Sequence, residues 1–358
     1  MEGSVFPQCI RSRRQLKPLQ PSLPGLAVTE RIALADAAPD LEAIRAAQVR
    51  IAPHVHRTPV LSSRSLDQLT GSRLFFKCEN LQKVGAFKAR GACNAVFSLT
   101  KEDAARGVAT HSSGNHGAAL AYAASQRGIP AWIVMPENAP AIKQANVREL
   151  GGQIRLCAPT RAAREASCAA VLADTGATLV HPYDDWRVIA GQATAALELL
   201  DELPELDALI APVGGGGLLS GTAIVAKALR SSIKVYGAEP AGADDAQRSL
   251  RAGHIELQTN PRTIADGLRT SLGDKTFSIL RERVDDIGTV SEEGIVRAMR
   301  LVWEKLKIVV EPSAAVPLGL LLEHKLPLQG LQVGIILSGG NVDLDHLPWQ
   351  HPKTADRG

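Results

Sequence analysis

Length, composition and charge place the chain among globular proteins and exclude two function classes. Its 358 residues are 45% hydrophobic and 22% charged, which fits one large or two closely joined domains. The net charge of +3 equals that of residues 1–29 alone, where four cations face one carboxylate. Because the rest of the chain is neutral, poor in aromatic residues and without a membrane-length apolar run, neither a nucleic-acid partner nor a membrane is expected.

The first 29 residues are expected to form a disordered basic extension. Pro18, Pro21 and Pro24 oppose a helix there, and the segment lacks the apolar core of a secretion signal. Organelle targeting is the alternative interpretation of this segment. The five cysteines of the chain are an odd number without the spacing of a metal clip or a redox pair, which favours free thiols in the reducing cytoplasm.

Short apolar runs alternate with longer amphipathic stretches from about residue 40 onward. Each run predicts a strand, and stretches such as 116–128 and 141–152 predict helices, because apolar residues recur there at i, i+3 and i+4 before a terminal glycine. The alternation predicts an α/β fold built on parallel sheets. The expected strands lie at 74–78, 107–113, 131–136, 154–159, 178–183, 208–215, 234–240 and 332–340.

Four consecutive glycines follow one of these strands in "APVGGGGLLSG" (211–221) and precede an expected helix. Glycines let successive backbone N–H groups turn inward, and the helix N-terminus adds partial positive charge, so the segment suits a phosphate. The dinucleotide pattern G-x-G-x-x-G fails in every register, which argues against a nicotinamide-dependent dehydrogenase. A tight strand-to-helix turn is the alternative, although four glycines exceed what a turn needs.

Lys88 stands among small and apolar residues in "KVGAFKARGACNAV" (83–96), at the expected start of a helix. A lysine kept from water has a lowered pKa, and its neutral amine can attack a carbonyl. Alone, such a lysine is more often a surface residue whose charged end reaches solvent. Together with a phosphate loop it predicts pyridoxal phosphate, which needs a lysine, a phosphate cradle and a partner for its ring nitrogen.

Two further loops follow strands, and open α/β sheets bind ligands at the carboxyl ends of their strands. In "ILSGGN" (336–341), Ser338 either faces the ring nitrogen or only ends the strand. The loop in "THSSGNHGAALA" (110–121) suits a carboxylate or a ring oxygen, or forms an ordinary helix N-cap. Its four candidate groups are Ser112, Ser113, Asn115 and His116.

A cluster of carboxylates follows another strand in "GAEPAGADDA" (237–246), where Glu239, Asp244 and Asp245 lie close together. Oxygen ligands without thiols suit a hard cation such as Mg²⁺ or Ca²⁺. The alternative is that Asp244 or Asp245 caps the following helix. The sequence therefore predicts either a cation site or a helix cap at this position.

Eight motifs between residues 38 and 346 resemble the fold-type II pyridoxal-phosphate enzymes, of the tryptophan synthase β-like kind, and among them the serine racemases and serine/threonine dehydratases. The resemblance implies two open, twisted, mainly parallel sheets flanked by helices, and a homodimer. It implies a large cofactor-binding domain at 30–100 and 185–348, a small domain at 101–184 and a C-terminal tail at 349–358. The motifs are "GAFKARGACNAV", "HSSGNHG", "IAGQATAALEL", "PVGGGGLLSG", "EPAGADDAQRS", "TIADGLRTS", "VWEKLKIVVEPSAA" and "LSGGNVD".

The same resemblance implies a role for each site residue. Lys88 would bind the cofactor covalently, and Ser113 would face the opposite side of its ring, so that one takes the α-proton and the other returns it. The further cofactor contacts would be Phe87, Asn115, Gly214, Gly215, Gly216, Gly217, Gly267 and Ser338. The substrate carboxylate would meet Ser112, Asn115, His116 and Arg164. A divalent cation would be bound by Glu239, Asp245 and the carbonyl of Ala243.

By this resemblance the chain is expected to act on β-hydroxy amino acids, on L-serine first and on L-threonine and 3-hydroxyaspartate after it. Removal of the α-proton would lead either to a 2-oxo acid and ammonia or to the other enantiomer. "SSGNHG" keeps the Ser113 hydroxyl that the "SAGNHA" pattern of dedicated threonine dehydratases lacks, which favours racemisation. The alternatives are a dedicated threonine or 3-hydroxyaspartate ammonia-lyase and a non-catalytic, cofactor-binding regulatory protein.

Overall fold

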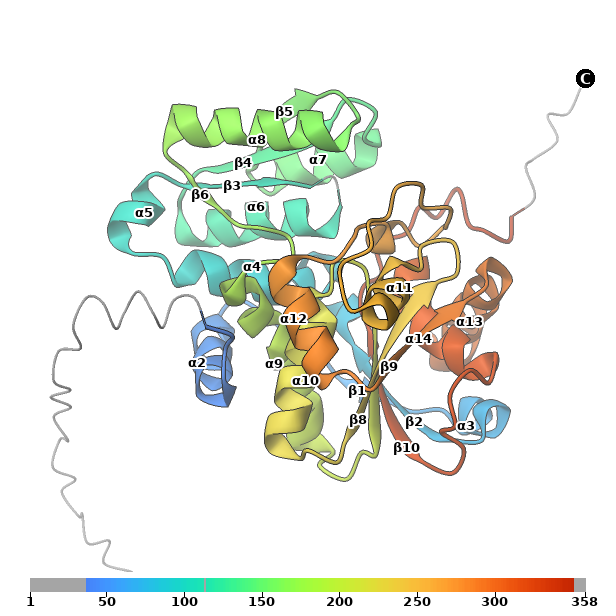
Figure 1. The fold of residues 1–358 in the computed structure, drawn as a ribbon. Coiled ribbons are helices and arrows are strands. Elements are labelled where there is room, and N and C mark those ends of the chain that lie inside the picture. The colour runs from blue at the N-terminus through green and yellow to red at the C-terminus, as the bar shows by residue number, and fades with distance from the viewer. Residues whose placement is uncertain (1–36, 113, 351–358) are drawn as a thin grey trace, which may run out of the picture. The chain divides into compact units, whose positions relative to one another are not determined.

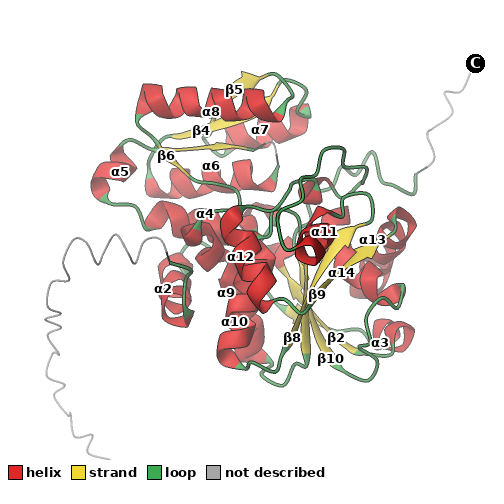
Figure 2. Cartoon of the chain, viewed as in Figure 1, coloured by secondary structure: helices red, strands yellow, loops and turns green. Residues whose placement is uncertain are grey.

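The structure, a computed structural model, describes residues 37–112 and 114–350 of the chain. In this part of the chain strands and helices alternate, and the strands form two separate sheets flanked by helices (Figure 1 and Figure 2). This α/β architecture of two mainly parallel sheets confirms the fold predicted from the sequence. The helices are α2 (Leu41–Ile51), α3 (Arg64–Thr70), α4 (Lys88–Phe97), α5 (Lys101–Ala105), α6 (Asn115–Arg127), α7 (Ala141–Glu149), α8 (Arg161–Thr175), α9 (Trp186–Glu202), α10 (Gly217–Leu229), α11 (Asp245–Ala252), α12 (Asp274–Arg283), α13 (Glu292–Leu306) and α14 (Pro312–Leu322), with short 3₁₀ turns η1 (Glu79–Leu81), η2 (Lys83–Gly85) and η3 (Asp266–Leu268).

The larger sheet has the strand order β1-β2-β10-β7-β8-β9. Only the short β1 is antiparallel to its neighbour, and the other pairs are parallel. Its central strand β7 is buried at every residue, because helices cover both faces of a parallel sheet and favour continuous apolar runs. The strands are β1 (Val60–Leu61), β2 (Arg73–Cys78), β7 (Ala208–Pro212), β8 (Lys234–Pro240), β9 (Asp286–Val290) and β10 (Gln332–Leu337).

The smaller sheet is entirely parallel, with the order β5-β4-β3-β6. Helix α8 covers one of its faces and α6 the other, as Figure 1 shows. All of its strands lie within residues 101–184, the range predicted for the small domain, whose boundaries remain a prediction. The strands are β3 (Val108–His111), β4 (Ala131–Pro136), β5 (Gln153–Cys157) and β6 (Thr178–Leu179).

Two apolar cores lie against the larger sheet. Helices α9, α10 and α12 supply one core, and α13 and α14 supply the other. A buried leucine such as Leu219 or Leu320, fully enclosed in these cores, contributes about 2 kcal/mol of burial free energy. These cores fix the helices so that the N-terminus of α10 lies directly after the carboxyl end of β7, the edge at which open α/β sheets bind ligands.

Most strands lie where the apolar runs predict them. The predicted strands 131–136 and 234–240 coincide with β4 and β8, whereas the strand expected at 178–183 ends at Leu179. Strands β1 and β9 were not predicted. The basic extension at 1–29 and most of the tail at 349–358 lie outside the described residues. Within the described residues, no helix is long and apolar enough to span a bilayer.

Candidate active site

Helix α4 begins at Lys88, directly after a turn in which Gly85 has a φ angle of 68°. A side chain at Gly85 would also lie 2.5 Å from Asn341 Oδ1, so both the backbone angle and the close approach require glycine here. The Phe87 N–H donates to the carbonyl of Ser338 over 3.0 Å. The loop after β10 therefore fixes where α4 begins and where the Lys88 side chain leaves the backbone.

The Lys88 amine is held by protein groups. Its Nζ donates to the carbonyl of Pro182 over 2.8 Å and lies 5.0 Å from the centre of the Phe87 ring. Burial lowers the pKa of Lys88 to about 8, although the carboxylate of Glu311 opposes this shift. About half of the amine is therefore neutral near pH 8, and the neutral form is the nucleophile that attacks a carbonyl.

The glycine loop 214–217 joins β7 to α10. Gly216 has a φ angle of 91° and is the N-cap of the helix. The backbone N–H groups of these four glycines have no acceptor in the described part of the chain, and they lie at the end of α10 where the helix dipole is positive. A row of unpaired donors at a helix N-terminus fits a phosphate group.

Residues from other elements pack against this loop. A Cβ at Gly215 would lie 2.2 Å from the ring of Tyr183, so the ring rests directly on the backbone there. The Thr276 hydroxyl donates to the Gly215 carbonyl over 2.8 Å, and the Asp184 carboxylate accepts the Thr276 N–H over 3.1 Å. Tyr183 and the N-terminus of α12 therefore determine the shape of the glycine loop.

Ser338 and Gly267, both predicted to contact the cofactor ring, lie near the same edge of the larger sheet. Ser338 is 3% exposed, and its hydroxyl forms no hydrogen bond within the described residues, which leaves it able to meet a ring nitrogen. The Gly267 N–H donates to Ser313 Oγ over 3.1 Å, and the Gly267 carbonyl lies 3.1 Å from a Cβ placed on Gly214. The segments predicted to bind the cofactor therefore converge at the carboxyl ends of β7 and β10.

Asn115, the first residue of α6, is held at both ends of its side-chain amide. Its Nδ2 donates to Glu311 Oε1 over 2.9 Å, and its Oδ1 accepts from Asn341 Nδ2 over 2.9 Å. Ser112 directly follows the preceding strand β3, and its hydroxyl accepts the N–H of Gly114 over 3.3 Å. The two polar residues flank the turn into α6, where the sequence predicts contacts to a ring oxygen and a carboxylate.

His116 is buried, and its Nε2 lies 3.1 Å from the carbonyl of Val180. Because a carbonyl only accepts, Nε2 carries the proton and Nδ1 is an acceptor, which has no partner among the described residues. Burial, and after it the charge of Lys88, lower the pKa of His116 well below its usual value. The free Nδ1 of this neutral ring needs a partner that donates a hydrogen bond. The substrate carboxylate predicted to meet His116 only accepts, so it suits this nitrogen poorly.

For two predicted residues, one substrate-binding and one catalytic, the structure shows no bond to the site residues described above. Arg164 lies in the first turn of α8, and its charge acts on Cys157 at the end of β5. Its side chain forms no hydrogen bond or ion pair within the described residues. Ser113 lies outside the described residues. The roles of both residues remain predictions.

Glu239 and Asp245, predicted to bind a cation, lie at the end of β8 and the start of α11. The Glu239 carboxylate accepts the N–H groups of Ala246 and Gln247 over 3.2 and 2.7 Å, and one Asp245 oxygen is buried without a partner in the described residues. Burial raises the pKa of Glu239 to about 9 and that of Asp245 to about 7. Two buried carboxyl groups with raised pKa values fit a divalent cation.

The same geometry bears on the alternative prediction, that Asp244 or Asp245 caps α11. Asp244 is the N-cap of α11 but makes no side-chain capping bond, and its carboxylate pairs with Arg248 over 2.9 Å. Ala243, whose carbonyl is the third predicted ligand, is buried in the same turn. The described residues contain no group of three or more His, Cys, Asp or Glu side chains placed for a metal, so any cation here depends on backbone carbonyl or water ligands.

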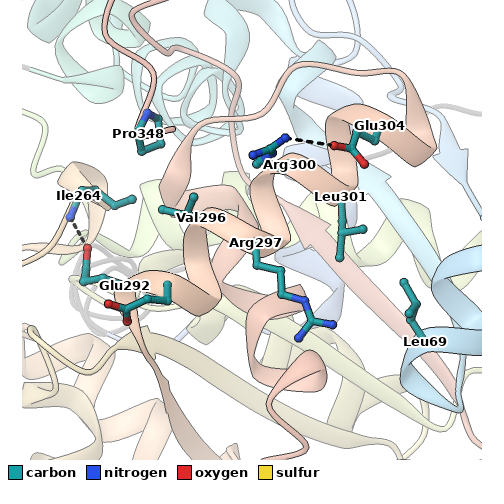
Figure 3. A pocket seen from close by; sticks show the side chains of 10 residues that line it. Leu69, Ile264, Glu292, Val296, Arg297, Arg300, Leu301, Glu304 and Pro348 are labelled. Carbon is teal, nitrogen blue, oxygen red and sulfur yellow. Dashed lines mark hydrogen bonds and ion pairs between the residues drawn. The ribbon is translucent and has the colours of Figure 1, made fainter. Parts of the chain in front are cut away.

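Pockets lie both beside this site and away from it. One of about 370 Å³ includes Asn115, Lys143 and Asn341 in its lining. Another, of about 730 Å³, lies along α13 between Arg297, Arg300 and Pro348 and contains none of the predicted site residues (Figure 3). The larger pocket is therefore separate from the candidate active site.

Three residues at the site were not singled out by the sequence. Glu311 and Ser313, at the start of α14, bond Asn115 and Gly267, and Tyr183 packs on the glycine loop. The available signal was the segment "IVVEPSAAV", where a lone carboxylate stands in an apolar run before a proline suited to a helix start. A buried carboxylate in such a run needs a partner, and the sequence does not show which residue this is.

Comparison with known proteins decides the family. The family model described as "Pyridoxal-phosphate dependent enzyme" matches residues 51–339. The chain belongs to this family. The resemblance seen in the sequence is thereby confirmed, and the open N–H groups of the glycine loop, the unpaired Ser338 hydroxyl and the Lys88 amine fit the cofactor that this pyridoxal-phosphate enzyme requires.

Individual relatives of this pyridoxal-phosphate enzyme carry related activities in their names. The chain is 52% identical over 311 residues to the β-hydroxyaspartate dehydratase of Paracoccus denitrificans (strain Pd 1222), covering 87% of this chain and 99% of the relative. It is 50% identical over 323 residues to the serine racemase of Arabidopsis thaliana, covering 89% and 97%. The structure matches that of maize serine racemase with a TM-score of 0.85 at 51% identity, covering 86% and 95% of the two chains. It also matches the T.th. threonine deaminase with a TM-score of 0.81 at 49% identity, covering 85% and 99%.

Proposed function

We propose that this enzyme is a serine racemase and L-serine dehydratase acting on β-hydroxy α-amino acids. The convergence of the Lys88 amine with the glycine loop and Ser338 carries the proposal. The names of the relatives support the substrate class, since serine, threonine and 3-hydroxyaspartate all carry a hydroxyl on Cβ. Retention of Lys88 argues against a non-catalytic regulatory protein.

In this proposal each residue binds a different part of the cofactor. Pyridoxal phosphate supplies a carbonyl for amines and an electron-withdrawing ring. Lys88 would hold it covalently, and the N–H groups of 214–217 would bind its phosphate. The Ser338 hydroxyl would meet the ring nitrogen without forcing a proton onto it, Asn115 would donate to the ring oxygen, and Phe87 and Gly267 would flank the ring.

Lys88 then moves the reacting proton. Its lowered pKa leaves Nζ able to take the α-proton from the substrate. The substrate carboxylate is bound by Ser112 and the backbone N–H of Asn115, with Arg164 as the proposed cation. Loss of the β-hydroxyl as water, followed by addition of water, converts L-serine into pyruvate and ammonia. A proton delivered from the other side by Ser113 instead gives D-serine. Both outcomes share one proton abstraction, so one site can support both.

A dedicated 3-hydroxyaspartate or threonine ammonia-lyase is the second candidate. It is favoured by the 52% identity to the β-hydroxyaspartate dehydratase and by the match to the threonine deaminase. The two candidates differ in substrate preference and in whether the other enantiomer accumulates. Substrate preference depends on what surrounds the β-substituent, whereas racemisation depends on Ser113.

One assay separates these candidates. The purified enzyme is supplied with pyridoxal phosphate and incubated in turn with L-serine, L-threonine and 3-hydroxyaspartate, and the 2-oxo acid, ammonia and enantiomers are measured together. We expect pyruvate and D-serine from L-serine, and Ser113→Ala to abolish D-serine formation. Preference for 3-hydroxyaspartate or threonine without racemisation would favour the second candidate. A protein that binds the cofactor but converts none of them would be the regulatory alternative.

The proposal extends to a cation, an assembly and a compartment. Glu239, Asp245 and the Ala243 carbonyl would bind Mg²⁺ or Ca²⁺, which would neutralise the buried carboxyl groups. A homodimer, suggested by the sequence resemblance, is tested by light scattering during size-exclusion chromatography. The four described cysteines are buried and unpaired, which suits the reducing cytoplasm.

A further inference from the structure

Glu311 is a buried carboxylate at the candidate active site without a part in the proposed reaction. It is 4% exposed and occupies the N-cap of α14, yet its side chain does not cap that helix. Both carboxylate oxygens instead accept from Asn115 Nδ2, over 2.9 and 3.2 Å. The carboxylate therefore accepts no hydrogen bond from the N–H groups at the start of α14, and it bonds instead to a residue of α6.

This bond fixes the direction of the Asn115 amide. At its other end, Asn115 Oδ1 accepts from Asn341 Nδ2, which also donates to the Val84 carbonyl over 2.8 Å. With an acceptor at one end and a donor at the other, the amide can face only one way. The second N–H of Asn115 Nδ2 is then the donor assigned above to the ring oxygen of the cofactor.

Glu311 also lies beside the segment that carries Lys88. A Cβ placed on Gly339 would lie 2.6 Å from Glu311 Oε1 and 3.3 Å from the Cβ of Ala86, which precedes Lys88 by two residues. The Glu311 carboxylate favours the protonated form of Lys88 and opposes the effect of burial on that pKa. Burial and then the charge of Asp266 raise the pKa of Glu311 itself to about 7, whereas Asn115 and Lys143 oppose this shift. Glu311 is therefore mostly ionised where Lys88 titrates. The polar and charged groups that face it are Lys88, Asn115, Lys143, Asp266 and Asn341.

We propose that Glu311 is a positioning residue of the candidate active site: its carboxylate orients the Asn115 amide toward the cofactor, and its negative charge holds the proton on Lys88. The inference rests on the proposed function for the roles of Asn115 and Lys88. It assigns to Glu311 two separable effects, one through a hydrogen bond and one through charge. Variants that change one effect and keep the other can distinguish them.

The charge effect is tested with Glu311→Gln, which keeps the shape and an acceptor oxygen. The rate at which the full-length chain binds pyridoxal phosphate covalently, followed by absorbance from about pH 6 to about pH 10, reports the fraction of neutral Lys88. Borohydride reduction and peptide mass spectrometry establish that Lys88 is the residue attached. We expect the midpoint of the rate profile to fall by about one pH unit, because the protonated amine loses a nearby negative charge.

The hydrogen-bond effect is tested by the dissociation constant for pyridoxal phosphate. Glu311→Ala removes the acceptor and should raise this constant about tenfold, and Glu311→Gln should leave it within about threefold. Glu311→Asp keeps the charge on a shorter side chain, so the midpoint should stay near that of the wild type while the dissociation constant rises. Because it is conservative, Glu311→Asp also serves if Glu311→Ala does not fold.

Glu323→Gln is the matched control. Glu323 follows the same helix, at its other end, and its carboxylate accepts from the Ser291 hydroxyl over 2.6 Å. This control should change neither the midpoint nor the dissociation constant. An unmoved midpoint in Glu311→Gln overturns the proposal, as do additive effects of Glu311→Ala and Asn115→Ala in the double variant. None of these measurements uses turnover, so an enzyme inactive on β-hydroxy amino acids would contradict the proposed function without affecting this test.

Discussion

At the scale of single residues, the environment of Lys88 limits the positive charge that the site can hold. Burial lowers the pKa of Lys88, and it also lowers the pKa of the nearby His116, which is therefore neutral. The Glu311 carboxylate acts in the opposite direction, because its charge raises the pKa of Lys88. The Pro182 carbonyl accepts from Nζ over 2.8 Å in either protonation state of the amine. The amine is therefore positioned by a neutral acceptor and can lose its proton without losing that contact.

Lys88→Arg tests whether this amine is the attachment point. Arginine keeps a positive charge and a similar length, but a guanidinium stays protonated and does not attack a carbonyl. We expect 2-oxo acid formation to fall at least about a thousandfold, and the cofactor to be lost on dialysis after borohydride treatment. Lys83→Arg, in the turn before α4, is the matched control and should keep both properties. Covalent cofactor in Lys88→Arg would place the attachment on another lysine.

Gly215→Ala tests the proposed phosphate loop. The added Cβ would lie 2.2 Å from the Tyr183 ring, so either the ring or the loop has to move and the row of N–H groups is displaced. We expect the dissociation constant for pyridoxal phosphate to rise about tenfold or more. The double variant Gly215→Ala/Tyr183→Ala provides space for the Cβ and should recover part of the affinity. Unchanged affinity in Gly215→Ala would mean that the phosphate is bound elsewhere.

At the scale of elements, the sequence predicts what local patterns encode. The apolar runs predict β4 and β8 with the bounds that the structure has. β1 has only two residues, and the apolar residues of β9 stand singly beside Asp286, Gly288 and Thr289, so neither strand contains an apolar run. The order of the larger sheet depends on pairs such as Gln332 with Arg73, which no local pattern contains. The same limit applies to the site. Lys88 and the glycine loop stand in recognisable motifs, but Glu311 acts through Asn115, 196 residues away in the chain.

Helix α4 is anchored by a buried ionic network behind Lys88. Arg90, fully buried, donates to Glu79 over 2.7 Å and to Glu198 over 2.8 Å, and Lys77 donates to Glu198 over 2.6 Å. The two carboxylates and the two cations balance, so no net charge is buried. Removing one member leaves a buried charge without its partner, which is costly even where the whole network adds little stability.

Arg90→Met should therefore lower the free energy of unfolding by about 3–5 kcal/mol, measured by urea denaturation at neutral pH. Arg106→Met is the control, since Arg106 pairs with Asp103 on an exposed surface where its side chain is 50% accessible. A surface pair contributes at most about 1 kcal/mol. Equal effects of the two substitutions would show that burial of the network does not anchor α4 as argued.

At the scale of the whole molecule, the candidate site draws on both sheets. Asn115 begins α6 beside the smaller sheet, whereas Glu311 is the N-cap of α14 beside the larger one. Lys143 of α7 pairs with Asp266 of η3 over 2.5 Å. That exposed ion pair contributes at most about 1 kcal/mol. The packing of α4 against both α6 and α9 is the stronger connection, and it places Lys88 where the two sheets contribute residues to one site.

The stability of the whole chain should depend on pH through Glu239 and Asp245. Their pKa values in the folded chain, about 9 and about 7, lie above those of ordinary carboxyl groups, so the folded state holds protons that the unfolded chain has released. In a chelator, the free energy of unfolding should therefore fall as pH rises, by at most about 1.4 kcal/mol per pH unit for each group. Asp245 contributes to this fall up to about pH 7 and Glu239 up to about pH 9.

Mg²⁺ or Ca²⁺ should reverse this loss, because a bound cation stabilises the ionised carboxylates, and the stabilisation should be greatest at the upper end of the pH range. Glu239→Gln should flatten the pH dependence in chelator and weaken the response to the cation. Glu202→Gln, at the exposed end of α9, should leave both unchanged. Thermal or urea unfolding across this pH range, with and without each cation, measures the difference. A free energy of unfolding that changes neither with pH nor with cation would show that these carboxyl groups have ordinary pKa values in the folded chain, and that no cation binds between them.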